Sequence, residues 1–190
     1  MNQTEESIAD HLERYLGPIQ RGWSAKDDSS GIQVVQFVDR PVEGVMTVAS
    51  LGLSSSSLKM ATGTKVRQEF LLSINSEMNV DHLASFLITF AAYVKKQGNA
   101  LLRGDIVGPS SPLVPGVRVN SIYASIPVFF NEEICTFKTT DPPTVLVSLL
   151  PLHGSEAIFV RKHGWEIFED LLEKENPDLF DMNRSPLRKV

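Results

Sequence analysis

Apolar residues recur every three or four positions in several stretches of the chain, which is the spacing of an amphipathic helix. The longest stretch, 80–97, carries this pattern from Leu83 to Val94. Asn79 stands where a helix N-cap is expected, and Gly98 follows two lysines that suit the negative end of the helix dipole. We therefore predict a central helix over 80–97. Shorter helices are predicted over 4–16, 155–163 and 165–176.

Alternating or continuous apolar runs bounded by Gly, Pro, Asp or Ser predict strands. The clearest alternation lies in 66–74, where Val66, Phe70 and Ile74 share a mainly buried face and the other face is partly wet. The run 145–150 is apolar at every position but Ser148, which is typical of a strand buried on both faces. Further strands are predicted over 32–38, 43–53 and 117–128. Because strands and helices do not alternate strictly, the pattern indicates an α+β fold, with a mixed sheet packed against the central helix between N- and C-terminal helices.

Two segments interrupt this pattern. The segment 104–116, GDIVGPSSPLVPG, is the richest in Pro and Gly and predicts a long irregular loop. Such loops are uncommon in compact domains unless they bind something or move. Four serines follow a turn at Gly52 and predict a polar loop or a strand edge. We expect partner-binding residues in both segments: Ser54, Ser55, Asp105, Pro109 and Ser110.

Charged residues recur every three positions after Pro177, near the end of the chain. They can form local ion pairs or caps that fix this segment to the body, or they can contact a protein partner. The acids of the preceding helix lie on its polar side, which favours a solvated face over acid–base chemistry. If this region makes the contact, its binding residues are Asp170, Asp178, Asp181 and Arg184.

Length and composition narrow the class of protein. A chain of 190 residues can bury a full core and predicts one domain over 1–190. A net charge of −5 argues against nucleic-acid binding, which needs clustered Lys and Arg. The N-terminus is polar and acidic, unlike a signal peptide, and no apolar run approaches the roughly 20 residues of a membrane helix. We therefore expect a cytoplasmic protein without membrane contact.

Motifs for catalysis or metal binding are not found in the sequence. The four histidines have no metal-ligand spacing, and neither a GxSxG turn nor a phosphate-binding loop occurs. Cys135 is the single cysteine and lies in an apolar setting, which indicates a small buried hydrophobe. We expect no catalytic residue, no metal and no cofactor.

Three segments resemble the suppressor of fused domain family. EGVMTVASLGLS at 43–54 is similar to the family's strand and turn ending in T-LGLS, and VRQEFLLSI at 66–74 is similar to its R-EL strand. The tail HGWEIFEDLLEKENPDLFDMNRSP, which begins at His163, completes a resemblance that spans roughly residues 18 to 186. The LGLS turn and the late Asp-x-x-Arg segment are specific when they occur together.

The resemblance implies a mixed α/β protein-binding domain rather than an enzyme. In the animal member of the family a second domain follows, and the two clamp a short transcription-factor peptide by strand addition. This chain ends at Val190, so we expect it to be similar to the single-domain bacterial members, some of which are immunity proteins. The leading hypothesis is a cytoplasmic immunity protein, or antitoxin, that occludes a cognate toxin. Its acidic charge suits a basic toxin such as a nuclease.

Two other hypotheses stay open. One is a regulatory protein-interaction domain that has no toxin. The other is a small-ligand enzyme whose site converges only in three dimensions and uses His82, Glu69 or Arg67 across the sheet, and a deep pocket with an unpaired buried carboxylate or histidine would favour it. The pattern predicts no oligomeric state.

Overall fold

A mixed β-sheet forms the centre of the protein. The structure, a computed structural model, describes residues 6–25 and 30–190, and within them the sheet has nine strands. The strands are β1 (Arg21–Ser24), β2 (Gln33–Val38), β3 (Val45–Leu51), β4 (Leu58–Lys59), β5 (Lys65–Asn75), β6 (Ile106–Val107), β7 (Ser121–Ser125), β8 (Thr136–Phe137) and β9 (Thr144–Leu152). Their order is β1-β2-β3-β5-β9-β7-β6, with β4 beside β5 and β8 beside β9. Only the β5–β9 pair is parallel among these described strands, which confirms the predicted α+β class.

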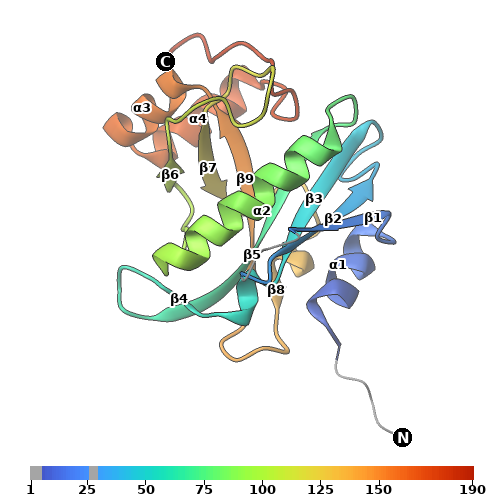
Figure 1. The fold of residues 1–190 in the computed structure, drawn as a ribbon. Helices are drawn as coiled ribbons and strands as arrows, with labels where there is room; N and C mark the ends of the chain where they lie inside the picture. Colours follow the sequence, from blue (N-terminus) through green and yellow to red (C-terminus); the bar gives the residue numbers. More distant parts are fainter. Residues whose placement is uncertain (1–5, 26–29) are drawn as a thin grey trace, which may run out of the picture.

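Helices cover both faces of this sheet (Figure 1). They are α1 (Ile8–Leu16), α2 (Val80–Gln97), α3 (Gly154–His163) and α4 (Trp165–Glu175). Helix α2 packs on one face, where its apolar stripe meets side chains of β2, β3 and β5. Helix α1 and the α3–α4 pair cover the other face. The even-numbered apolar residues of β9 pack with these helices and the odd-numbered ones pack on the α2 side, since successive side chains of a strand point to opposite faces. The result is a sheet with helices on both sides.

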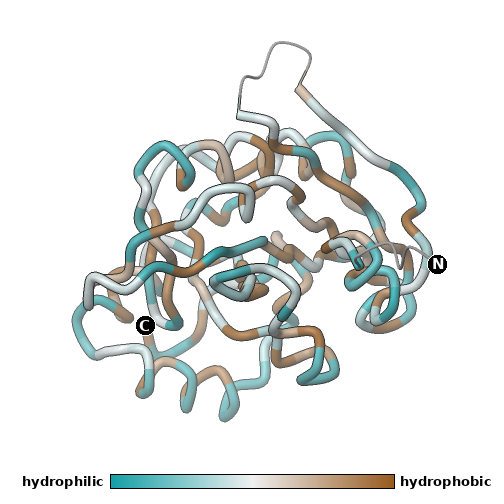
Figure 2. Tube along the Cα trace, turned by 90° about the horizontal axis from the view of Figure 1, so that it is seen from below, coloured by the Kyte–Doolittle hydropathy of each residue, from teal (hydrophilic) through white to brown (hydrophobic). Residues whose placement is uncertain are grey.

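Three apolar clusters fill the spaces between these layers, and in Figure 2 much of the hydrophobic chain accordingly lies in the interior. The largest lies under α2, and it includes Phe70 of β5 and Leu87 of α2, both 0% exposed. A second lies between α1 and the sheet, around Leu12 and Leu71. The third joins Tyr123 of β7 to Phe168 of α4. As predicted, one face of β5 is mainly buried and the other is partly exposed, at Arg67 and Ser73; residues 68–72 between them are buried because β5 has clusters on both faces.

The long elements agree with the predictions better than the short ones. Helix α2 has the predicted bounds, and the side chain of Asn79 accepts hydrogen bonds from the backbone of its first turn. Helix α1 begins at Ile8 because Ser7 forms a capping box with Asp10, and the first two residues of the predicted helix lie outside the described part. The strand predicted over 117–128 is shorter, Ser121–Ser125. The short strands β1, β4, β6 and β8 were not predicted.

Candidate functional site

An apolar groove of about 230 Å³ lies beside the C-terminal end of α2, on the face of the sheet that this helix covers. Side chains of β5 and β9 form its floor, including Val66 and Val147. One wall is the segment 101–103, which follows α2, and the other is Ile126 at the end of β7. The remaining lining residues are Met60, Gln68, Ser125, Val145 and Leu146. A hollow of this kind is a usual place for a binding site.

The groove opens where strand pairing is interrupted. Strand β7 pairs with β9 only as far as Ser148, and β8 pairs with β9 only at Thr144 and Val145. In the described part of the chain, therefore, no strand pairs with Leu146 or Val147 on the side away from β5. This gap in the sheet leaves space that side chains line but do not fill.

The wall of the groove is fixed by a pair of hydrogen bonds. The side-chain amide of Gln68 donates to Leu101 O at 2.8 Å and accepts from Leu101 N at 3.0 Å, as a neighbouring strand would. The next residue, Leu102, is 36% exposed, and Ile126 on the opposite wall is 46% exposed. Exposed apolar side chains at the rim of a hollow mark a surface suited to a protein contact.

Arg103 extends this rim and is held by two residues, Glu169 and Trp165. Its Nε donates to Glu169 Oε1 at 3.1 Å, and a second guanidinium nitrogen forms an ion pair with the same carboxylate. The guanidinium also lies over the ring of Trp165, 4.4 Å from the ring centroid. Tyr123 donates to Glu169 Oε1 at 2.5 Å. We had expected the acids of this helix to form a solvated face. Glu169 is instead bound by Arg103 and Tyr123.

Tyr123 keeps its proton at any ordinary pH. Burial, and then the hydrogen bond to Glu169, raises the pKa of Tyr123 above its usual value of 10. The hydroxyl therefore remains a donor, which fixes Glu169 and, through it, Arg103. The position of the rim is set before any partner arrives.

The predicted loop 104–116 is only partly irregular. Residues 106–107 form β6, which pairs with β7. Asp105 is exposed at the groove rim, where its carboxylate accepts a hydrogen bond from Leu102 N at 2.7 Å. Pro109 and Ser110 are also exposed but lie beyond β6, and Ser110 N donates to Asn120 O at 2.9 Å. Of the residues predicted in this loop, Asp105 does not line the groove itself but is the one bonded to a residue that does, Leu102.

The serine run forms a short 3₁₀-helix, Leu53–Ser55, above a buried carboxylate. Glu69 is 0% exposed. It accepts hydrogen bonds from the hydroxyls of Ser50 (2.5 Å) and Ser54 (2.7 Å), and from the backbone of Gly52 (2.8 Å) and Ser54 (2.9 Å). Burial raises the pKa of Glu69, and these donors oppose the rise. Ser54, a predicted contact residue, is therefore part of the fold's interior polar network.

The same turn is held from the outside by a lysine. Lys95 Nζ, in the last turn of α2, donates to Gly52 O at 3.1 Å and to Ser55 Oγ at 2.9 Å. Gly52 has a φ of +100°, and a Cβ there would lie 2.4 Å from Gly31 O, so this position requires glycine. Ser55 is exposed, and its hydroxyl donates to Gly52 O at 2.7 Å.

Arg184 is inside the protein, not at its surface as the contact hypothesis required. It is 7% exposed, and two of its guanidinium nitrogens donate to the buried carboxylate of Glu156 at 2.6 and 2.8 Å. Glu156 also accepts hydrogen bonds from the backbone of Leu187 (3.0 Å) and His153 (2.9 Å). The ring of His153 bonds Arg184 O at 2.8 Å. This cluster attaches the C-terminal segment to α3.

The two aspartates of this segment organise its turns. Asp178 accepts a hydrogen bond from Phe180 N at 2.9 Å, and Asp181 accepts one from Asn183 N at 2.7 Å. Phe180 O in turn accepts from Asn75 N at the end of β5. Asp178 is exposed and Asp181 is half-buried. Their carboxylates shape the segment, and the exposed side of Asp178 stays open to solvent.

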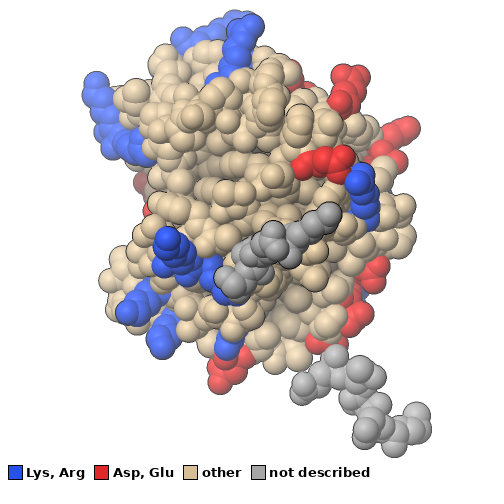
Figure 3. Space-filling view, viewed as in Figure 1, with Lys and Arg blue, Asp and Glu red and all other residues tan. Residues whose placement is uncertain are grey.

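The predicted contact residues do not form one surface. Ser54 and Ser55 lie at the C-terminal end of α2, and Asp178 lies beyond its N-terminal end, about 27 Å away along an 18-residue helix. Asp170 is exposed on α4. Acidic and basic side chains are also separated on the face that Figure 3 shows, where most acidic side chains lie on the right and most basic ones on the left.

The residues proposed for a small-ligand enzyme do not converge either. Glu69 and Lys95 contact the same turn, but His82 lies 13 positions before Lys95 in α2, about 20 Å away. Arg67 also contacts this turn, since it donates to Ser54 O at 2.6 Å, and it therefore lies far from His82 as well. Within residues 6–25 and 30–190, no group of three His, Cys, Asp or Glu side chains is placed to hold a metal ion. None of their helices is long and apolar enough to cross a membrane.

Cys135 is half-buried rather than fully buried. It packs at the edge of the cluster under α1, and burial raises the pKa of its thiol. A raised pKa keeps the thiol protonated and therefore a poor nucleophile. This agrees with our interpretation of Cys135 as a packing residue.

Comparisons with known proteins give a consistent result. Residues 28–185 match the family model of the suppressor of fused protein (SUFU). The chain is 23% identical over 180 residues to "Immunity protein YqcF" of Bacillus subtilis (strain 168), covering 87% of this chain and 86% of that protein.

Solved structures share the fold. A putative SUFU homologue from Neisseria gonorrhoeae FA 1090 superposes with a TM-score of 0.77 at 17% identity, covering 96% of each chain. A chain of the Sufu–Fu complex crystal structure gives a TM-score of 0.70 at 12% identity, covering 95% of this chain and 90% of that one.

Proposed function

This chain belongs to the suppressor of fused protein family, and from that premise we propose that it is a non-catalytic binding protein that acts as an immunity protein. It would occlude the active surface of a cognate toxin inside the cell that makes both. The observation that carries the proposal is the similarity to a protein named as an immunity protein, because it extends over 87% of this chain rather than over one motif.

The groove beside α2 is the surface that best fits such a contact. It offers exposed Leu102 and Ile126 around an apolar floor, with Arg103 and Asp105 at the rim. Interfaces of this kind combine an apolar centre with a polar edge. Since Gln68 and Glu169 both hold the 101–103 wall in place, little ordering of that wall is needed on binding, which favours affinity.

Charge supports a basic partner. The net charge of −5 would attract a cationic toxin and raise the rate of encounter, although the apolar centre would supply most of the affinity. Binding should therefore weaken only moderately as salt is raised.

A regulatory interaction domain without a toxin is the second candidate. The structural similarity to a chain of the Sufu–Fu complex favours it, because that protein is found with a partner called Fu. The two candidates differ in one outcome: loss of an immunity protein makes a cell sensitive to its own or its siblings' toxin, and loss of a regulator does not.

The experiment starts from a tagged pull-down at low and high salt, with mass spectrometry of the retained proteins. Each retained protein and each neighbouring gene product is then expressed in a test host, alone and together with this chain. We expect one of them to stop growth and this chain to restore it. Rescue should be lost in the double variant Leu102→Asp and Ile126→Asp.

Ile158→Asp is the matched control, because Ile158 is 60% exposed on α3, outside the lining of the groove. It should rescue growth as well as the unchanged chain. If no candidate is toxic, the immunity proposal fails and the regulatory one remains. If rescue survives the groove variant, the groove is not the contact.

A further inference from the structure

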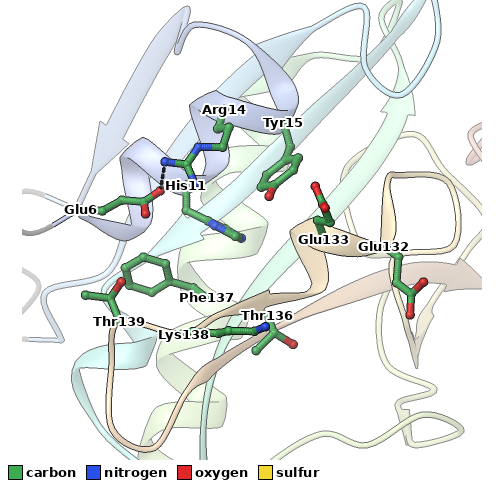
Figure 4. Close-up of a pocket in the computed structure, with 10 residues that line it drawn as sticks. All are labelled: Glu6, His11, Arg14, Tyr15, Glu132, Glu133, Thr136, Phe137, Lys138 and Thr139. Carbon is green, nitrogen blue, oxygen red and sulfur yellow. Dashed lines mark ion pairs between the residues drawn. The ribbon is translucent and has the colours of Figure 1, made fainter.

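A second hollow, a cleft of about 570 Å³, lies on the opposite side of the sheet from the groove. It is formed between α1 and the segment 132–139, which contains a 3₁₀-helix (Glu132–Cys135) and β8. Figure 4 shows side chains from both elements pointing into it. The contact proposed above does not use this cleft.

The floor of the cleft is aromatic and contains a buried histidine. His11 is 5% exposed and lies between Tyr15, with ring centroids 5.0 Å apart, and Phe137, at 5.3 Å. His11 Nε2 is 3.0 Å from Ile134 O, and because a carbonyl only accepts, Nε2 carries the hydrogen. Within residues 6–25 and 30–190, Nδ1 has no hydrogen-bond partner. Nδ1 is therefore uncommitted in a cleft that the ring lines.

The charges around the cleft are not balanced. Arg14 Nη2 lies 2.8 Å from Glu6 Oε1, so these two charges are paired with each other. Among the described residues that line the cleft, Lys138 is then the remaining cation, against the carboxylates of Glu132 and Glu133. In Figure 4 Glu133 lies beside Tyr15, whereas Glu132 points away from the centre of the cleft. The end of the cleft at Tyr15 is therefore acidic.

These features select a particular kind of ligand. A carboxylate and a free imidazole nitrogen both accept hydrogen bonds, and a tyrosine ring attracts a cation over its face. A planar cation with several N–H donors satisfies all three at once, and the guanidinium group of arginine is that cation. An anion would find Lys138 as the one unpaired cation among the described lining residues, against the two carboxylates of Glu132 and Glu133.

We propose that this cleft binds a guanidinium group, with Glu133 as its counter-ion, Tyr15 as its stacking surface and His11 as a hydrogen-bond acceptor. The guanidinium can come from free arginine or from an arginine side chain of a protein. With free arginine, Lys138 would meet the ligand's carboxylate. The proposal stands apart from the immunity function, since it involves another face and no toxin.

Two matched probes test it: Nα-acetyl-L-arginine amide and the corresponding citrulline derivative, which has the same shape without the charge. Each is titrated into the full chain labelled with ¹⁵N, and amide shifts are followed by NMR. We expect saturable shifts in α1 and in 132–139 with the arginine probe, and binding weaker by about fivefold or more with citrulline. Glu133→Gln should weaken binding of the arginine probe by a similar factor.

Glu43→Gln is the control, because Glu43 is equally exposed in the β2–β3 turn, and it should leave binding unchanged. A third arm compares free L-arginine with the blocked probe. Tighter binding of free arginine identifies a free amino acid as the source, and equal binding identifies a protein side chain. Equal shifts with citrulline, shifts outside the cleft, an unchanged affinity in Glu133→Gln, or no saturable shift would each overturn the proposal.

Discussion

Two regions of this protein treat their side chains in opposite ways. Glu69 and Glu156 are both 0% exposed, and each carboxylate accepts four hydrogen bonds, three of them from the segment that it holds. The groove beside α2 instead leaves apolar side chains, Leu102 and Ile126, partly in water with nothing covering them in the described residues. The two buried carboxylates thus have their hydrogen-bond partners, whereas the apolar side chains of the groove remain uncovered.

The difference separates fold from function. Glu69 holds the LGLS turn and Glu156 holds Arg184 of the late Asp-x-x-Arg segment, so the residues that make the family recognisable serve the interior. A buried charge needs its partners to avoid a large desolvation cost, which constrains residue type strongly. An exposed apolar rim has no such internal constraint. We therefore expect the largest losses of stability at the buried carboxylates and the smallest at the groove.

The largest effect is expected for Arg184→Ala. This change leaves the carboxylate of Glu156 buried without its cation, and breaking a buried ion pair in this way costs about 3–5 kcal/mol. Urea denaturation followed by circular dichroism measures the loss. Arg188→Ala, four residues away on an exposed side chain, should change the free energy of unfolding by less than about 0.5 kcal/mol. Equal effects would contradict the assignment of Arg184 to the interior.

Glu69→Ala should be next, at about 2–4 kcal/mol, because it leaves several donors of the Gly52–Ser54 turn unpaired in a buried place. The same denaturation measurement applies. Glu166→Ala, on the exposed face of α4, is the control and should have almost no effect. If the two losses were similar, the turn would not depend on the carboxylate beneath it.

The pH dependence of stability sharpens the same point. Burial raises the pKa of Glu69 above its usual 4.5, so between that value and the raised pKa the folded state binds more protons than the unfolded state. The stability from the neutral carboxyl is complete below about pH 4.5 and is lost as pH rises through the raised pKa. The free-energy difference between the unchanged chain and Glu69→Gln should therefore shift against the unchanged chain over this range. A difference independent of pH would show that the four donors cancel the effect of burial.

Tyr123→Phe probes the border between the two regions. It removes the hydroxyl that fixes Glu169 and thereby Arg103 at the groove rim, and one such hydrogen bond contributes about 0.5–1.5 kcal/mol. Tyr93→Phe is the matched control, since Tyr93 is 49% exposed and its loss should not be measurable. Thermal denaturation of both variants makes the comparison. A loss of stability as large as that in Arg184→Ala would mean that Tyr123 supports the interior, as the two buried carboxylates do.

Sequence patterns predicted the parts of the fold that depend on local spacing. The bounds of α2 followed from its apolar stripe, Asn79 and Gly98, and the central strand β9 followed from its mainly apolar run. Strands of two residues, such as β6 and β8, are too short to show a repeating pattern in the sequence. Their pairing is decided by the longer strand beside them. The partly wet face predicted for β5 is found only at Arg67 and Ser73, because the Gly52–Ser54 turn over Glu69 and α1 over Leu71 cover its middle, which is a tertiary effect.

The site was predicted less well for a related reason. Asp105 reached the groove rim, but Leu102, Arg103 and Ile126 were missed, since the groove exists only where two strands leave a gap beside β9. Arg184 was proposed as a contact because its charge repeats with two aspartates. Its partner, Glu156, lies 28 positions earlier, and no local spacing reveals that pair.

The smallest effect on stability is expected at the groove itself. Leu102 is 36% exposed, so Leu102→Asp should change the free energy of unfolding by less than about 0.5 kcal/mol and should lower the fluorescence of a dye that binds apolar surface. A loss above about 1.5 kcal/mol would mean that Leu102 supports the core. If stability is kept while dye binding falls, the fold does not need this apolar side chain. Its exposure then requires another explanation, and contact with a partner is the one that the groove's shape and its pre-positioned rim provide.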